Sequence, residues 1–74
     1  MKIRVFGLLK GYTKGRDLVE IDLDSEKSLG DIIGGLNIPE NYVYIIEKNG
    51  KTVERDAIVN NNDQITLIPL LSGG

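Results

Sequence analysis

Residues 19–24 alternate strictly between apolar and acidic side chains, and this alternation constrains the fold more than any other stretch. Val19, Ile21 and Leu23 are apolar, whereas the residues between them are Glu or Asp. Side chains of a β-strand point alternately to its two faces, so the pattern predicts one dry and one wet face. Such a strand belongs to an antiparallel sheet that is covered on one side only.

The N-terminal stretch alternates in the same way. Basic side chains at positions 2 and 4 belong in water, which turns Ile3 and Val5 inward. The continued alternation points Phe6 and Leu8 outward, which is unusual for two large apolar side chains. They either pack beneath the glycine-bounded turn at 11–15 that leads into the next strand, or they contact a partner.

A single helix is predicted after this hairpin. Ser28 is a good N-cap residue, and Asp31 three positions later places a negative charge at the positive end of the helix. The apolar residues that follow have helical spacing and form one stripe: Leu29, Ile32, Ile33 and Leu36. Glycines at 30, 34 and 35 each weaken the helix by roughly 1 kcal/mol, so packing on the sheet must hold it. Asn37 and Pro39 end it.

The C-terminal half reads as strands joined by turns. Residues 43–48 are rich in β-branched and aromatic side chains, and Asn49-Gly50 is a strong hairpin signal into residues 51–54. Residues 56–59 are interpreted as one short helical turn. A tight turn at 60–63 and a last strand at 64–68 follow.

Composition bounds the classes of function. The 74 residues form one domain, and 41% hydrophobic with 27% charged residues is ordinary globular usage. A net charge of −2 disfavours nucleic-acid binding. The absence of Cys and His removes thiolate and imidazole catalysis and most zinc sites, and the acidic run Asp22, Asp24 and Glu26 lacks the spacing of a calcium loop. No metal site, no membrane association and a cytoplasmic location are therefore expected.

One helix on one face of a mixed four- to five-stranded sheet is the α+β architecture that accommodates these faces. That element order, followed by Gly73-Gly74, resembles the ubiquitin-like β-grasp fold and, more narrowly, the MoaD/ThiS family of sulfur-carrier proteins. The resemblance covers the whole chain. It implies a β-grasp domain at residues 1–70 and a flexible tail at residues 71–74.

The tail carries the most specific part of the resemblance. MoaD tails have an apolar residue, prolines and a small residue before Gly-Gly, which this chain matches with Ile68, Pro69, Ser72, Gly73 and Gly74. The Asn49-Gly50-Lys51 segment, Asp56 and Asp63 look like the family's hairpin and the turn before its last strand. Two residues depart from the pattern, since Leu70 replaces a second proline and Asn62 replaces a glycine.

The resemblance implies that the protein is a substrate and not an enzyme. A ubiquitin-activating-type adenylating enzyme, MoeB/ThiF-like, would use ATP and magnesium to adenylate the carboxylate of Gly74, which a sulfur donor then converts to a thiocarboxylate. Gly73 has no side chain to block a narrow channel, and residues 71–74 reach at most ~13–14 Å. The chain itself would bind no cofactor. The sulfur acceptor would be a synthase, most readily a molybdopterin synthase large subunit in molybdenum cofactor biosynthesis, with thiamine thiazole or tRNA thiolation as other acceptors.

Outward apolar residues are the candidates for docking such partners. If Ile65 and Leu67 face the helix, the alternate positions 66, 68 and 70 face outward, next to the first strand. The predicted docking residues are Phe6, Leu8, Ile68, Leu70 and Leu71, and either Tyr44 or Ile46 extends them.

Two other functions and one trivial interpretation remain open. Activated Gly74 would modify proteins if a lysine amine attacked it to form an isopeptide. A binding-only β-grasp module would need neither Gly73 nor Gly74. The two glycines also fit a frayed chain end with no role.

Overall fold

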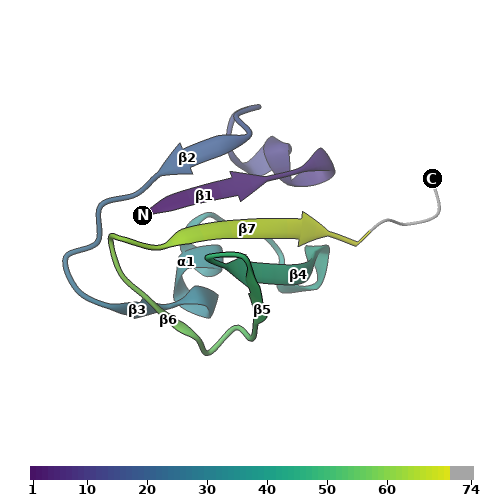
Figure 1. Cartoon of the computed structure of the whole chain (residues 1–74). Coiled ribbons are helices and arrows are strands. Elements are labelled where there is room, and N and C mark those ends of the chain that lie inside the picture. Colours follow the sequence, from purple (N-terminus) through teal and green to yellow (C-terminus); the bar gives the residue numbers. More distant parts are fainter. Residues whose placement is uncertain (71–74) are drawn as a thin grey trace.

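A five-stranded sheet in the order β2-β1-β7-β4-β5 is the frame of the fold, and α1 packs against it (Figure 1). The computed structural model describes residues 1–70. The elements in chain order are β1 (Lys2–Val5), η1 (Gly7–Tyr12), β2 (Leu18–Glu20), β3 (Lys27–Ser28), α1 (Leu29–Gly35), η2 (Glu40–Tyr42), β4 (Val43–Lys48), β5 (Lys51–Val53), β6 (Ile58–Val59) and β7 (Gln64–Pro69). β1 and β7 are parallel neighbours, whereas the other pairs in this sheet are antiparallel. The predicted α+β class with a mixed sheet is confirmed.

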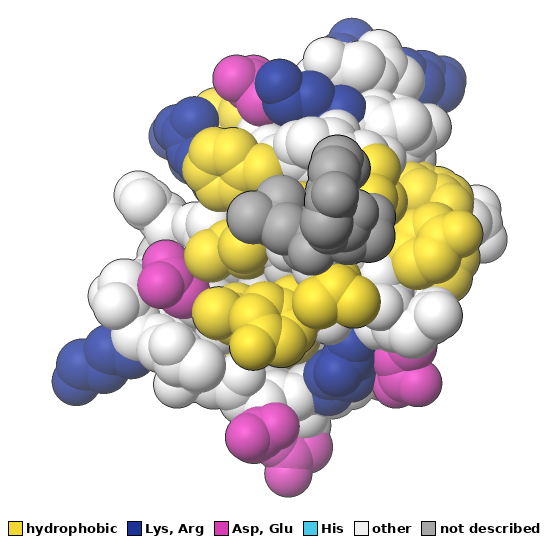
Figure 2. Space-filling view, turned by 90° about the vertical axis from the view of Figure 1, so that its right-hand side faces the viewer, with side chains coloured by type: hydrophobic (Ala, Val, Ile, Leu, Met, Phe, Trp, Pro, Cys, Tyr) yellow, Lys and Arg dark blue, Asp and Glu magenta, His cyan; other side chains and the backbone are white. Residues whose placement is uncertain are grey.

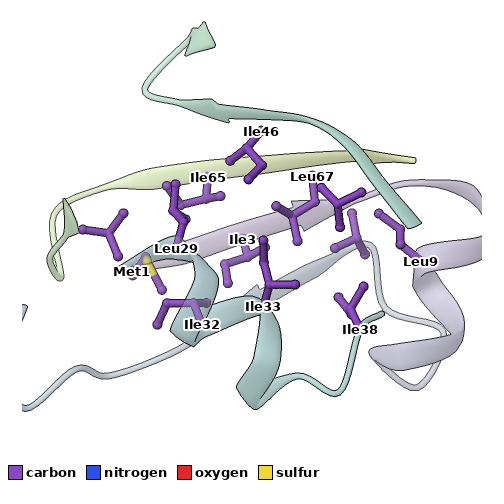
Figure 3. Packing of buried hydrophobic residues seen from close by; sticks show 13 residues of the cluster. Met1, Ile3, Leu9, Leu29, Ile32, Ile33, Ile38, Ile46, Ile65 and Leu67 are labelled. Carbon is purple, nitrogen blue, oxygen red and sulfur yellow. The ribbon is translucent and has the colours of Figure 1, made fainter. Parts of the chain in front are cut away.

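The hydrophobic core lies between the sheet and α1. Ile3 and Val5 from β1, and Ile65 and Leu67 from β7, turn to the same face and are almost fully buried. Figure 3 shows side chains from the strands and from α1 pointing toward one another, among them Ile33. The inward positions predicted for the first and last strands are therefore confirmed.

The helix begins and ends where the sequence predicts. The Ser28 Oγ accepts a hydrogen bond of 3.2 Å from the Asp31 backbone N–H. The N–H groups of Leu29 and Gly30 donate to backbone carbonyls of the segment that follows β5, at 2.9 and 2.8 Å. These partners satisfy donors that a helix N-terminus leaves unpaired. Asn37 then takes a φ of +62°, and the helix ends there.

The first strand is shorter than predicted. β1 ends at Val5, and Gly7 adopts a φ of +55°, which L side chains disfavour and which turns the chain into the 3₁₀-helix η1. Leu9 is fully buried in the core, but it lies in this helix and not in a strand. The predicted continuation of the strand through Leu8 is therefore wrong, although Phe6 and Leu8 are exposed as expected.

Two further expectations are corrected. β2 ends at Glu20, and Ile21 and Leu23 lie in the following loop, where they are only partly buried against the core. Ile58 and Val59 do not form a helical turn, because they pair as β6 with β3 in a separate two-stranded antiparallel sheet.

The hairpin between β4 and β5 has the turn that its sequence predicts. Asn49 and Gly50 take φ angles of +53° and +87°, the left-handed pair of a type I′ turn. The predicted turn at 60–63 is present, with the Asp63 backbone N–H donating to the Asn60 carbonyl at 3.2 Å. None of its residues has a positive φ, and the Asn62 N–H donates to Asn60 Oδ1 at 2.9 Å.

Candidate functional site

The candidate site is the C-terminal end of β7, from which residues 71–74 follow. β7 is the central strand of the sheet and is paired along its length with β1 on one side and β4 on the other. Its side chains alternate, so Ile65 and Leu67 are buried beneath α1 while Thr66 and Ile68 are half-buried on the open face. A central strand cannot shift without breaking two ladders of hydrogen bonds, so the position of Pro69 is well defined by its neighbours.

Pro69 and Leu70 are held by contacts beyond the strand itself. Pro69 is buried and lies close to Gly7: a Cβ atom added to Gly7 would be 3.6 Å from Pro69 Cγ. The Leu70 backbone N–H donates to the Tyr42 carbonyl at 3.3 Å. The described chain therefore ends between η1 and η2.

Exposed apolar side chains surround this end of β7. Five of them come from segments that meet there, and we call them the apolar collar: Phe6, Leu8, Tyr42, Tyr44 and Leu70. Their exposed fractions are 40–66%. Figure 2 looks onto this end of the molecule and shows hydrophobic side chains gathered near its centre, with most charged side chains toward the rim. Among the described residues, the other large exposed apolar side chains are Leu18 and Ile58.

A bulge in β4 decides which residue joins the collar. Tyr44 and Ile46 would point to the same face of a regular strand, and both were candidates. The register shifts between Val43 and Ile45, so Tyr44 is 66% exposed whereas Ile46, opposite Leu67, is buried at 4%. Ile46 as an extension of the docking surface is therefore wrong.

Sequence reasoning missed Tyr42. Its backbone carbonyl holds Leu70 and its ring is 40% exposed in the collar. Tyr42 is the last residue of η2 and lies outside the predicted strand at 43–48, so the alternation of that strand carried no signal for it.

The remaining predicted residues divide into two groups. Ile68 is half-buried on the open face, opposite Ile45 of β4, and borders the collar without belonging to it. Leu71, Gly73 and Gly74 lie outside the described residues, as does the predicted tail.

A polar junction fixes the opposite end of β7. The Asp63 carboxylate accepts hydrogen bonds from Asn49 Nδ2 at 2.9 Å and from the Asn60 N–H at 2.8 Å, and Lys48 Nζ lies 4.0 Å away. Asn49 Oδ1 also accepts from the Gln64 N–H at 2.9 Å. Burial alone would raise the pKa of Asp63, but these hydrogen bonds and the nearby positive charges leave the pKa below its ordinary value.

The acidic run at 22–26 does not contribute to the site. Asp22, Asp24 and Glu26 are exposed. Across residues 1–70 no three His, Cys, Asp or Glu side chains are grouped so that they could hold a metal ion. Nor does this part of the chain contain a helix that is long and apolar enough to cross a membrane.

The fold defines a class of protein, the ubiquitin-like β-grasp proteins. A crystal structure of SAMP1 from Haloferax volcanii superposes with a TM-score of 0.73 and 23% identity, covering 100% of this chain and 98% of that one. A solution structure of a thiamine biosynthesis protein from Geobacter metallireducens gives a TM-score of 0.57 and 19% identity, covering 100% and 88%. At these identities the likeness concerns the fold. No curated protein matches the chain.

The sequence itself matches the ThiS family over residues 3–74, and the chain belongs to that family. It is therefore a ubiquitin-like sulfur carrier, which is a substrate for partner enzymes and not an enzyme itself. Carriers of this type work with adenylating enzymes related to ubiquitin activation and with synthases that accept the sulfur.

Proposed function

We propose that the carboxylate of Gly74 is the sulfur-carrying group of this protein. The observation that carries the proposal is the position of β7, a central strand that ends in an apolar collar with Gly73-Gly74 only a few residues further along the sequence. Fully extended, residues 71–74 reach at most about 13–14 Å beyond Leu70, which is enough to enter a recessed site in a partner.

The chemistry requires activation of that carboxylate by the partner. A free α-carboxyl group has a pKa of roughly 3.5 and is ionised at neutral pH, so it is a poor electrophile. The adenylating enzyme would use ATP and magnesium to form an acyl-adenylate and release pyrophosphate. Hydrosulfide, or a sulfur donor equivalent to it, then attacks the carbonyl carbon and displaces AMP, which leaves a thiocarboxylate on Gly74.

The apolar collar is the surface on which we propose that the adenylating enzyme docks. An enzyme that takes up the tail must approach the end of β7, and the collar surrounds that end. Burial of partly exposed rings such as Phe6 and Tyr44 is the kind of contact that dominates binding energy in protein interfaces. Gly73 would then lie in the partner's channel, where any side chain would obstruct the passage of Gly74.

The sulfur acceptor we favour is the thiazole precursor of thiamine. Membership of the ThiS family supports this choice, as does the name of the Geobacter metallireducens protein, which has a similar fold. The resemblance of the tail to MoaD instead favours molybdopterin, the acceptor expected first from the sequence. Both acceptors use the same thiocarboxylate, so they are distinguished by the synthase that consumes it.

Intact-mass measurement tests the proposal directly. The full chain is incubated with the ThiF-like adenylating enzyme, ATP, magnesium and sulfide, and the expected product is heavier by the replacement of one oxygen with one sulfur. A variant that lacks Gly74, and Gly73→Val, should remain unmodified although both fold normally. No mass change on the wild-type chain would refute the proposal.

Addition of one of two sulfur-accepting synthases then identifies the pathway that receives the sulfur. Loss of the thiocarboxylate on addition of a thiazole synthase supports the thiamine role, whereas loss only with a molybdopterin synthase large subunit supports the other pathway. Gly-Gly remnants on lysines of other proteins would instead indicate that the activated chain is a protein modifier.

A further inference from the structure

We infer that η1 and η2 form a clamp at the end of β7, and that Tyr12 and Tyr42 are the positioning residues that hold the clamp closed. The inference rests on the proposed function, because it concerns how the fold presents residues 71–74 to the adenylating enzyme. Its structural part, the clamp itself, can be measured on the protein alone.

Each 3₁₀-helix contacts a different residue at the end of β7. On one side, a Cβ atom added to Gly7 would lie 3.6 Å from Pro69 Cγ, which is van der Waals contact. The start of η1 therefore lies against the buried proline. On the other side, the last residue of η2, Tyr42, accepts the Leu70 N–H at 3.3 Å. Pro69 has no N–H to donate. The Leu70 N–H is therefore the one that ties the end of β7 to η2.

The two helices contact each other through an aromatic pair. The Tyr12 and Tyr42 rings lie 6.2 Å apart between centroids at an interplanar angle of 65°, an edge-to-face arrangement. Tyr12 is half-buried against the core, and Tyr42 is 40% exposed. The pair therefore links segments thirty residues apart in the chain, across the end of the central strand.

Each helix is also anchored away from the pair. The Thr13 hydroxyl lies within hydrogen-bonding distance of the Lys10 and Arg16 carbonyls and fixes the loop that follows η1. The Arg55 guanidinium donates to the Glu40 carbonyl and, at 3.1 Å, to the Val43 carbonyl, which fixes η2 from its outer side. Side-chain hydrogen bonds therefore hold the loop after η1 and the two ends of η2, and the ring contact links the two helices.

The clamp determines how far the chain is held beyond β7. Strand ends with exposed hydrogen bonds open readily unless other contacts hold them. With the clamp closed, Pro69 and Leu70 are held at the end of β7. If the clamp opens, these two residues are released, and the maximum distance between the last held residue and the terminal carboxylate grows by about 7 Å. A longer connection lowers the effective concentration of that carboxylate in the partner's active site.

Hydrogen exchange on the full-length protein tests whether the clamp exists. We expect the Leu70 amide to exchange about 3- to 10-fold faster in Tyr12→Leu than in the wild type. This factor corresponds to weakening of the Leu70–Tyr42 hydrogen bond by the net contribution of a typical hydrogen bond. Tyr12→Phe keeps the ring and should exchange like the wild type, as should Tyr44→Ala, which changes an exposed ring that does not join the two helices. Equal Leu70 exchange in Tyr12→Leu and wild type would overturn the inference. If Tyr12→Leu does not fold, Tyr42→Leu removes the same contact from its exposed side.

Adenylation kinetics of the full chain separate positioning from docking. Measured as pyrophosphate release by the ThiF-like enzyme with ATP and magnesium, Tyr12→Leu should lower kcat several-fold with little change in KM, and Tyr12→Phe should restore it. Tyr44→Ala, in the collar, should raise KM instead. Faster Leu70 exchange with an unchanged kcat would show that the clamp is structural only and would overturn the positioning role. If the wild-type chain is not adenylated, the proposed function fails, and Leu70 exchange alone decides whether the clamp exists.

Discussion

Replacement of Asp63 should destabilise the protein because its carboxylate joins the β4–β5 hairpin to the turn that precedes β7. It is 8% exposed and accepts hydrogen bonds from the Asn49 side chain and the Asn60 backbone. Its own carbonyl accepts the Lys2 N–H at 3.2 Å, which ties the start of β1 to the same turn. Asp63→Ala removes both side-chain hydrogen bonds and leaves the Asn60 N–H without that partner.

The expected loss follows from these two hydrogen bonds. A hydrogen bond to a charged group contributes roughly 1.5–3 kcal/mol, but the Asn49 amide is exposed and can bond to water after the change. The Lys48 ion pair, at 4.0 Å and partly exposed, adds less than about 1 kcal/mol. We therefore expect Asp63→Ala to lower the free energy of unfolding by about 2–4 kcal/mol. Asp63→Asn, which keeps one acceptor oxygen, should cost about 1–2 kcal/mol.

The same carboxylate makes stability depend on pH. Its pKa in the folded state lies below the unfolded value of roughly 3.9, so the folded state favours the ionised form. The stabilisation is complete above the unfolded pKa and is lost as the pH falls through the lower folded pKa. The difference in stability between wild type and Asp63→Asn should therefore be largest near neutral pH and should narrow in acid.

Urea denaturation followed by circular dichroism at a series of pH values measures both effects. With a denaturant slope of roughly 1 kcal/mol/M for a small domain, Asp63→Ala should shift the midpoint down by about 2 M or more. Asp22→Asn is the matched control, because Asp22 is exposed and the change should stay within about 0.5 kcal/mol. Equal midpoints for Asp63→Asn and wild type at neutral pH, or a difference that grows in acid, would contradict the reasoning. The kcat of adenylation should be unchanged well below the unfolding temperature, because Asp63 lies at the far end of β7.

Three further outcomes are expected. Phe6→Ala should raise the KM for the adenylating enzyme by about 5- to 10-fold with little change in melting temperature, and an unchanged KM in titrations of carrier against enzyme would remove it from the docking surface. Ile33→Ala, at a buried core position, should cost about 3 kcal/mol by urea denaturation, whereas exposed Ile58→Ala should cost less than about 1 kcal/mol; similar losses would mean that the core is wrongly assigned. Ser28→Ala removes the cap that accepts the Asp31 N–H and should cost about 1 kcal/mol, which Ser28→Thr should largely restore.

The sequence predicted those elements whose signals are local. Ser28 and the apolar stripe that follows it identified α1, and Asn49-Gly50 identified the hairpin, because caps and type I′ turns depend on residues next to one another. The inward and outward positions of β7 also followed from its alternation.

The elements that were missed depend on contacts distant in sequence. β6 is two residues long, so Ile58 and Val59 carry no recognisable period, and only pairing with β3 makes them a strand. η1 was hidden because residues 6–9 continue the alternation of β1 while the positive φ of Gly7 ends the strand. The bulge that exposes Tyr44 arises from the register of β4 on β7, which the sequence of β4 alone does not determine.

The central place of β7 has a consequence for how the chain is made. β1 is synthesised first, yet its parallel neighbour in the sheet is the last strand, so the middle of the sheet stays open until β7 has left the ribosome. Such long-range pairing is slow compared with local helix or hairpin formation. A nascent chain that stops before residue 64 lacks the strand that joins the two halves of the sheet and should be recognised as unfolded by cellular quality control. We therefore expect the chain without β7 to be unfolded, and Leu70 to take its place in the collar after β7 has paired with β1 and β4.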